Sequence, residues 1–333
     1  GGCAHGDASE APAVVQRQVC APPPVVVELA RFTAGHPRVG TAAVSAAGDR
    51  LAISDHRGRI NVWCLDDAPR LIATTDATHD RTVTALLFSD DGKTLYIASS
   101  RFCRDGRVDS WSIDRDRLTC VGATGVDVPA FIVANADGTL AMVTGESAWA
   151  LPAERTPADP DAWPDVCVRL RRNVAADLPV VVATHQGTFA TPVAVSADLA
   201  WAVVQTDVTR GVTDLYALRE PTGSPVASLA SGPNVVTFAP DASAVAMSTN
   251  GELRLFEVPS GRLRWAAPTK TIARAAFHPG GRWLLTTAMD GTLRWWHAET
   301  GVEQPAFEAG WRPPRVIEWA ADGATLVLVA DDG

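Results

Sequence analysis

The residues of this 333-residue chain that could carry out chemistry do not stand at catalytic spacings. The seven histidines are scattered, and no pair follows the His-Glu-x-x-His pattern of a zinc protease. The sequence also lacks the Gly-x-Ser-x-Gly turn of a hydrolase nucleophile and the glycine-rich loop that cradles phosphates. We therefore expect no catalytic residues, no metal site and no cofactor.

The six cysteines do not form a recognisable metal or disulfide framework. No Cys-x-x-Cys pair is present, so structural zinc and attached haem both lack their usual spacing. We expect most of these cysteines to be single buried thiols that pack as small hydrophobic side chains.

Cys3 is the exception, because it follows Gly1-Gly2 within a small and polar segment, residues 1–12, that we expect to be a flexible leader. A small pair before a cysteine resembles the end of a bacterial lipoprotein signal, which makes Cys3 a candidate lipid attachment site. An ordinary cysteine or a cloning remnant is the alternative.

Arginines gather in two short segments that have the composition of turns. One of them, residues 101–107, combines three arginines with a phenylalanine, and residues 57–59 occupy the matching turn of the preceding unit. Guanidinium groups bind carboxylates and phosphates in a bidentate manner. We predict that this rim contacts a partner, although ordinary solvated loops would have the same composition. The predicted partner-binding residues are Arg57, Arg101, Phe102, Arg104 and Arg107.

A second candidate surface lies in the last third of the chain, where tryptophan is concentrated. Tryptophan and arginine are enriched at the energetic centres of protein interfaces. Trp311 and Arg312 precede two prolines in a predicted connecting loop, so we predict that they bind a partner. Packing between structural repeats would explain most of the other tryptophans, including Trp265, Trp295 and Trp296.

The clearest structural unit runs from Phe277 to Trp296 and reads as three short strands joined by two tight turns. Fainter copies recur along the chain, and most of the spacings fall near roughly 40 to 45 residues. Each copy has a turn after its first strand. These turns are centred on Gly48, Gly92, Gly138, Leu199, Ala242, Gly281 and Gly323.

A second pattern supports the same register, because a turn glycine precedes an aromatic residue by five positions in five of the units. A glycine supplies the positive φ that such a turn requires. The pairs are Gly58 and Trp63, Gly106 and Trp111, Gly211 and Tyr216, Gly251 and Phe256, and Gly291 and Trp296.

These units resemble WD repeats, and the resemblance covers roughly residues 25 to 333. The closing Trp-Asp pair of that family is degenerate here, as in Trp63-Cys64 and Trp296-His297, while Gly35-His36 keeps the opening Gly-His pair. The resemblance implies a hydrogen-bonded brace of His, turn Asp, Ser or Thr, and Trp within a blade. Because only Asp105 and Asp290 stand at the turn-Asp position, few blades can hold the full brace.

The repeat count predicts an all-β fold, a seven-bladed β-propeller of four-stranded antiparallel blades in a single domain, residues 13–333. The last repeat lacks its outer strands, so Ala13 to Cys20 and Val25 to Phe32 are predicted to complete it and close the ring. Blade seven is then split between 13–35 and 311–333. One spacing is longer than the others, and we expect an insertion at about 152–178 in blade three.

Charge and composition narrow the class of partner. The net charge of −9 disfavours nucleic acid and anionic membranes, and no long uncharged apolar run predicts a membrane span. The preference for Arg over Lys and the abundance of Ala indicate a GC-rich bacterial genome.

The resemblance favours a non-catalytic scaffold for proteins or peptides, either anchored in the periplasm as a lipoprotein or part of a larger assembly. A cytoplasmic location is the alternative. A propeller enzyme or cofactor-binding protein, of the lactonase-like or quinoprotein type, would instead need a site at the central channel.

Overall fold

The computed structural model describes residues 39–66, 68–76, 81–101, 104–114, 117–126, 129–134, 140–144, 166–171, 177–183, 191–207, 211–218, 224–229, 232–249, 251–308 and 314–330. Every regular element in these ranges is a β-strand. The strands pair in an antiparallel manner and form six four-stranded sheets and one two-stranded sheet, which we number 1 to 7 in chain order.

The strands have the following bounds. Sheet 1 contains β1 (Val39–Val44), β2 (Arg50–Asp55), β3 (Ile60–Cys64) and β4 (Arg70–Thr75), and sheet 2 contains β5 (Thr82–Phe88), β6 (Thr94–Arg101), β7 (Arg104–Asp114) and β8 (Arg117–Val126). Sheet 3 contains β9 (Pro129–Ala134), β10 (Leu140–Thr144), β11 (Val166–Arg171) and β12 (Asp177–Ala183), and sheet 4 contains β13 (Thr191–Val195), β14 (Trp201–Asp207), β15 (Val212–Ala217) and β16 (Ala227–Ser228). Sheet 5 contains β17 (Val235–Phe238), β18 (Ala244–Thr249), β19 (Glu252–Glu257) and β20 (Leu263–Pro268), and sheet 6 contains β21 (Ile272–Phe277), β22 (Trp283–Ala288), β23 (Thr292–His297) and β24 (Glu303–Glu308). Sheet 7 contains β25 (Val316–Trp319) and β26 (Leu326–Val329).

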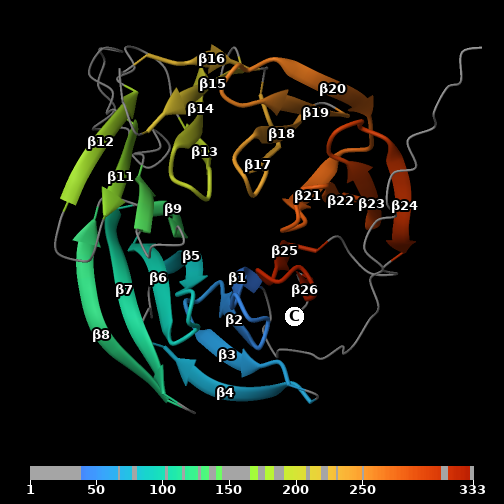
Figure 1. Cartoon of the computed structure of the whole chain (residues 1–333). Helices are drawn as coiled ribbons and strands as arrows, with labels where there is room; N and C mark the ends of the chain where they lie inside the picture. Colours follow the sequence, from blue (N-terminus) through green and yellow to red (C-terminus); the bar gives the residue numbers. More distant parts are fainter. Residues whose placement is uncertain are drawn as a thin grey trace, which may run out of the picture.

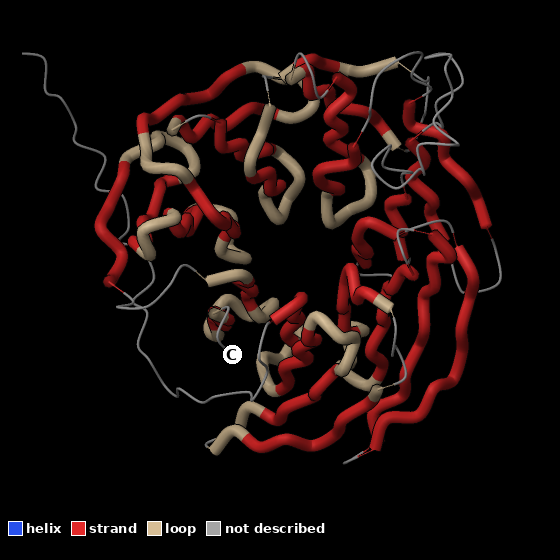
Figure 2. Tube along the Cα trace, turned by 180° about the vertical axis from the view of Figure 1, so that it is seen from behind, coloured by secondary structure: helices blue, strands red, loops and turns tan. Residues whose placement is uncertain are grey.

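The sheets follow one another around a central opening, with the first strand of each sheet innermost and the fourth outermost (Figure 1). The view from behind shows the same ring (Figure 2). The fold is therefore an all-β propeller with four-stranded antiparallel blades, as the sequence predicts. The turns between strands one and two, and between three and four, lie on one face of the ring, which we call face A. The turns between strands two and three, and the connections between sheets, lie on face B.

Burial explains why the inner strands are apolar on both sides. All six residues of β18 and of β22 are buried, because a neighbouring sheet covers each face of the strand. Outer strand β20, by contrast, alternates between exposed and partly buried residues. A strand covered on both faces needs a continuous apolar run, and a strand at the rim needs only an alternating one. The core consequently lies in the seams between sheets.

The repeated turn after the first strand is confirmed wherever the structure describes it. In each case the central residue has a positive φ, and its N–H donates to the carbonyl of the residue three positions earlier. These residues are Gly48, Gly92, Leu199, Ala242, Gly281 and Gly323. Gly138, the remaining predicted turn, lies outside the described residues.

The glycines that precede the aromatic residues follow the prediction with one correction. Gly58, Gly211, Gly251 and Gly291 have positive φ. Gly106, however, lies inside β7 and pairs with Ser100, because the β6–β7 hairpin extends farther than in the other sheets. The five aromatic residues themselves are buried or partly buried.

Sheets 1 and 7 contact each other directly and so join the two ends of the described chain. The Ala321 N–H donates to the Ala46 carbonyl at 2.9 Å. Buried Val39 and Ile53 of sheet 1 share a hydrophobic cluster with Val329 of β26. The first and last sheets of the described chain therefore pack against each other. The strands predicted at residues 13–20 and 25–32 lie outside the described residues.

The irregular sheet needs a correction to its predicted boundaries. The range 152–178 includes β11, which pairs along its whole length with β10 on one side and β12 on the other. Residues 166–171 are therefore the third strand of sheet 3 and no part of an insertion. The extra residues stand between β10 and β11, at 145–165, outside the described part of the chain.

The cysteine prediction is only partly right. Cys64 in β3 and Cys120 in β8 are free thiols on strands, but Cys64 is partly buried and Cys120 is exposed. Burial, followed by the hydrogen bond to Asp66, raises the pKa of Cys64. Both positions lie on the outer two strands of their sheets, the third strand in sheet 1 and the fourth in sheet 2.

Sheet 6 holds half of the polar brace that the family resemblance implies. The buried Trp296 indole donates to the Thr286 hydroxyl at 2.8 Å. The turn carboxylate of Asp290 bonds to Thr292 and to Lys270, and among the described residues it bonds to no histidine. The hydrogen bond from Lys270 contributes most to keeping the pKa of Asp290 well below its usual range.

Sheet 2 lacks even this half. In sheet 2, Ile97 stands at the position equivalent to Thr286, two residues beyond the strand partner of the tryptophan. The Trp111 indole N–H is consequently buried without a hydrogen-bond partner. Apolar packing therefore replaces the brace in that sheet.

Substitution of two neighbouring threonines of β22 by Val should affect the free energy of unfolding differently. Replacing Thr286 by Val should lower the free energy of unfolding by about 1–3 kcal/mol, because the Trp296 N–H loses its acceptor inside the core. Thr287 is also fully buried, but its hydroxyl has no hydrogen-bond partner in the described structure. Thr287→Val should therefore be neutral or stabilising. Urea unfolding of both variants tests this, and an equal loss in both would contradict it.

Candidate partner-binding surfaces

The structure places the predicted arginine rim on equivalent turns of neighbouring sheets. Arg57 lies in the β2–β3 turn and Arg101 at the end of β6, so both are on face B, and both side chains are exposed. The turn at Arg57 is fixed by Asp55, whose Oδ1 accepts from the Arg57 and Arg59 N–H groups at 2.8 and 2.9 Å. Arg101 and Arg104 are direct partners across the β6–β7 hairpin.

Two arginines of this rim are already engaged by carboxylates. Arg107 forms an ion pair with Asp109, which lies on the same side of β7 and is buried. Arg59 donates through Nε to Asp76 at 2.7 Å. Asp109 would be a buried charge without Arg107, so this arginine has a structural role, and its role in partner binding stays a prediction.

The remaining predicted positions cannot be placed on these surfaces. Cys3, Phe102, Trp311 and Arg312 lie outside the described residues, as does the side chain of Arg104. Their proposed roles stay predictions.

The described tryptophans of the last third are packed between sheets. Trp283, Trp295 and Trp296 are at most 3% exposed, which leaves no ring surface for a partner. Trp295 and Trp296 point to opposite sides of β23: Trp295 joins the cluster shared with sheet 7, and Trp296 joins the cluster shared with sheet 5. The packing interpretation of these residues is therefore confirmed.

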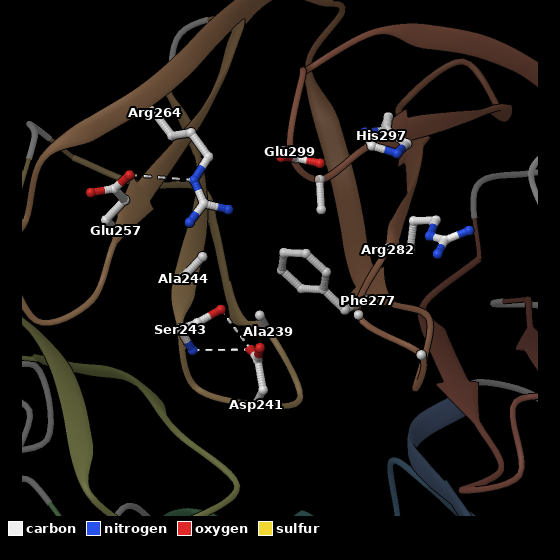
Figure 3. A pocket seen from close by; sticks show the side chains of 13 residues that line it. Ala239, Asp241, Ser243, Ala244, Glu257, Arg264, Phe277, Arg282, His297 and Glu299 are labelled. Carbon is white, nitrogen blue, oxygen red and sulfur yellow. Dashed lines mark hydrogen bonds and ion pairs between the residues drawn. The ribbon is translucent and has the colours of Figure 1, made fainter. Parts of the chain in front are cut away.

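A cleft between sheets 5 and 6 opens on face A and was not predicted from the sequence. Its volume is about 620 Å³. Arg264 and Asp241 lie on the sheet 5 side, Arg282 and Glu299 on the sheet 6 side, and Phe277 between them (Figure 3). The turns that mark the repeats supply Asp241 and Arg282, and other strands and turns of the same two sheets supply the rest, so these side chains converge only in the folded ring.

The cleft is polar and electrostatically mixed. Glu257 accepts two hydrogen bonds from Arg262, at 2.9 and 2.6 Å. The Glu257 carboxylate also lies 3.6 Å from the Arg264 Nε. The hydrogen bond from Arg262 contributes most to lowering the pKa of Glu257, and Arg264 adds to it. Arg282 and Glu299 on the opposite side form no ion pair within the described structure. The cleft can therefore present both donors and acceptors to a polar segment of a partner.

One carboxyl group on an innermost strand is unusual. Glu318 lies on innermost strand β25, and burial raises its pKa to about 7. It is two residues beyond Val316 and so faces sheet 1. Among the described residues, no three His, Cys, Asp or Glu side chains are grouped so that they could hold a metal ion.

The raised pKa of Glu318 predicts how stability depends on pH. The folded state binds the proton more tightly than the unfolded state, so stability is full below about pH 4.5 and falls as the pH rises to about 7. The loss is at most roughly 3 kcal/mol. Glu318→Gln should abolish this fall, which thermal melts of both proteins between pH 4 and 8 would show. Parallel curves for the two proteins would contradict the assignment.

Comparison with known proteins agrees with this geometry. The WD40 family model, described as WD domain, G-beta repeat, matches residues 69–112 and 263–297. The chain contains WD40 repeats. Each match includes the fourth strand of one sheet and the first three strands of the next, β4–β7 and β20–β23. A WD40 repeat is thus offset by one strand from the sheets of this ring.

Solved structures share the fold over nearly the whole chain. One is the Myceliophteria thermophila Cps50 (Swd1) β-propeller domain, with a TM-score of 0.66 and 15% identity, covering 89% of this chain and 94% of that one. Another is a chain of the Mitotic Checkpoint Complex, with a TM-score of 0.67, 14% identity and 96% coverage of both chains. No curated protein matches the sequence.

Within the described ranges, no helix has the length and apolar character needed to cross a bilayer.

Proposed function

We propose that this WD40 propeller is a non-catalytic scaffold that binds a protein or peptide partner. The observation that carries the proposal is the rigid ring of WD40 repeats, whose core lies in the seams and whose turns are left to vary. WD40 propellers are typically interaction scaffolds, and one similar fold was solved within a multiprotein complex.

The arginine rim on face B is the proposed contact surface. The Arg101/Arg104 pair sits side by side across one hairpin, and Arg57 lies at the equivalent turn of sheet 1. Trp311 and Arg312 are proposed as further contact residues because tryptophan and arginine are enriched at the energetic centres of interfaces. The cleft of face A, which Arg282 lines, is the second proposed contact surface.

Affinity purification with the whole chain as bait tests the proposal. The variants are Arg101→Glu with Arg104→Glu, Trp311→Ala, and Arg282→Glu, compared by quantitative mass spectrometry. We expect at least one of them to lose partners that the wild type retains. Leu263→Glu, at an exposed position of outer strand β20, is the control that should retain them. Retention of every partner by all variants would remove these surfaces from the proposal.

We further propose that the ring has seven blades and that residues 13–32 supply the outer strands of the last one. Two facts support this: sheet 7 has only β25 and β26 in the described chain, and WD40 repeats share strands between consecutive sheets. An uncovered β26 would leave unpaired backbone groups at a sheet edge.

Deleting residues 13–32 should therefore open the ring. We expect loss of the cooperative thermal transition or a large fall in its midpoint, together with increased association. Circular dichroism melts and light scattering measure both. A deletion of residues 1–12 alone is the control and should melt like the full chain. A cooperative melt that survives the longer deletion would refute the closure.

We also propose that a lipid on Cys3 holds the protein at a membrane facing the periplasm. The support is the Gly1-Gly2 pair that precedes this cysteine. Expression from its own gene with an alkyne-labelled fatty acid would test it. Cys3→Ser should lose both the label and the membrane fraction, and an unlabelled wild-type protein would overturn the proposal.

A further inference from the structure

The β21–β22 turn of sheet 6 lacks a carboxylate that four other sheets have in the equivalent turn. In those four turns an aspartate immediately precedes the residue with positive φ. Its Oδ1 accepts a hydrogen bond from the main-chain N–H two residues later, at 2.8 to 3.0 Å, and so satisfies the backbone of its own turn. The four aspartates are Asp91, Asp198, Asp241 and Asp322. Sheet 6 has Gly280 at this position, so its turn cannot form that bond.

The main-chain N–H of Arg282 is the group that the missing carboxylate would bind. Among the described residues this N–H makes no hydrogen bond, and the exposed Arg282 side chain forms no ion pair there. Sheet 1 also lacks the aspartate, with Ala47 in its place, but the equivalent N–H belongs to Asp49, whose own negative charge repels an anion. Among the described turns, Arg282 alone combines an open N–H with a positive side chain.

This turn forms one wall of the cleft of face A. Gly280 and Arg282 both line the cleft, and Asp241 and Arg264 lie on the opposite side (Figure 3). Phe277 lies between the two sides and is only 7% exposed, so it gives the cleft an apolar base. A carboxylate that enters the cleft can therefore occupy the place that an aspartate fills in the other turns.

The remaining charges of the cleft restrict what can accompany that carboxylate. Glu257 is neutralised by Arg262 and Arg264. Glu299 is exposed and forms no ion pair among the described residues, and Asp241 uses only its Oδ1 within its own turn. These two carboxylates repel a polyanion, and they attract a cation that stands next to the bound acid.

We propose that the cleft of face A binds an aspartate side chain of a partner protein, flanked by basic residues, at Gly280 and Arg282. The aspartate accepts from the N–H and the guanidinium of Arg282, and the basic residues pair with Glu299 and Asp241. Hydrogen bonds to an ionised carboxylate are roughly twice as strong as those between neutral groups. This inference rests on the proposed function as a partner-binding scaffold and names the segment that the cleft would take.

Fluorescence anisotropy with the labelled peptide Gly-Gly-Lys-Asp-Lys-Gly-Gly tests the site on the whole chain. We expect the wild type to bind it, and we expect about tenfold lower affinity when Asn replaces the Asp of the peptide or when the protein carries Arg282→Gln. Lys93→Gln is the matched control, because Lys93 occupies the same turn position in sheet 2 and Asp91 already accepts from its N–H. This variant should bind like the wild type.

Two variants of Gly280 separate ligand binding from a structural role. Gly280 does not have a positive φ, and a Cβ there would lie 3.1 Å from the His278 Nδ1, so Gly280→Ala and Gly280→Asp require the same small shift of His278. Gly280→Asp also supplies the missing carboxylate from the turn itself. It should therefore melt at a higher temperature than Gly280→Ala and bind the peptide at least about tenfold more weakly, whereas Gly280→Ala should retain binding.

Several outcomes would overturn the site. They are the absence of peptide binding by the wild type, equal affinity for the Asp and Asn peptides, undiminished binding by Gly280→Asp, and equal melting temperatures of the two Gly280 variants. Free aspartate that binds as tightly as the peptide would also overturn it, because the flanking basic residues would then contribute nothing. Partners captured from cells independently of Gly280 and Arg282 would leave the scaffold function standing and remove this site alone.

Discussion

Trp265→Ala is expected to cause one of the largest losses of stability, about 3–5 kcal/mol of unfolding free energy. Trp265 belongs to outer strand β20 of sheet 5, but its main contacts are with sheet 6. Its indole N–H donates to the Ala298 carbonyl at 2.8 Å, and its ring stacks on Trp296 at a centroid distance of 6.4 Å. Truncation therefore opens a cavity and leaves a carbonyl without its donor at the same seam.

Two further variants separate these contributions. Trp265→Phe keeps an aromatic ring and loses the donor, so we expect a loss of about 1–2 kcal/mol. Leu263→Ala lies two residues earlier on the same strand at a 47% exposed position and should cost less than about 0.5 kcal/mol. Urea and thermal unfolding of the three proteins give the comparison. Equal losses for Trp265→Ala and Leu263→Ala would show that the seam does not depend on this side chain.

Gly301 shows why the sequence could not reveal this contact. Its φ is +68°, and a Cβ there would lie 2.7 Å from the Trp265 ring. The glycine of one sheet thus leaves room for the tryptophan of the sheet before it. Glycine in the Thr300-Gly301 turn is explained locally by its backbone conformation, so nothing in the sequence points to a partner 36 positions away.

The repeat itself could be predicted because each sheet depends on local signals. Turn residues such as Gly281 and apolar runs such as β22 recur at a regular spacing, and they fix the strands without knowledge of distant contacts. The third strand of sheet 3 falls inside the insertion predicted at about 152–178, because the long segment before it has no such marker. Val166 to Arg171 carries an alternating pattern that suits an outer strand or an insertion equally well.

The candidate surfaces were less predictable, because they depend on which charges meet. Arg107 is of a residue type that is common at interfaces, yet it forms an ion pair with Asp109 of the same protein. That ion pair requires only that the two residues lie on the same side of one strand. Asp241 and Arg282 line the cleft of face A but are 41 positions apart, so they come together only when sheets 5 and 6 pack against each other. Contacts between side chains on one strand can be predicted from the sequence far more readily than contacts between side chains of neighbouring sheets.

Gly48→Ala should destabilise the seam where sheets 7 and 1 meet. Gly48 has a φ of +73°, and a Cβ there would lie 2.8 Å from the Thr325 hydroxyl and 3.1 Å from the Ala320 Cβ. Thr325 and Ala320 belong to the β25–β26 hairpin of sheet 7, beside the Ala321–Ala46 hydrogen bond. The positive φ costs the alanine variant about 1 kcal/mol, and the steric clash that pushes the two sheets apart costs more. We therefore expect the free energy of unfolding to fall by about 2–4 kcal/mol in total.

Gly281→Ala is the matched control for this seam. Gly281 occupies the equivalent turn of sheet 6 with a φ of +71°, but no atom lies within 4 Å of a Cβ built there. This variant carries the backbone strain alone and should lose about 1 kcal/mol. The difference between the two glycine variants therefore measures the contact between the first and last sheets. Thr325→Ala should recover part of the loss in Gly48→Ala and none in Gly281→Ala, whereas equal losses in both glycine variants would show that this seam does not hold the ring closed.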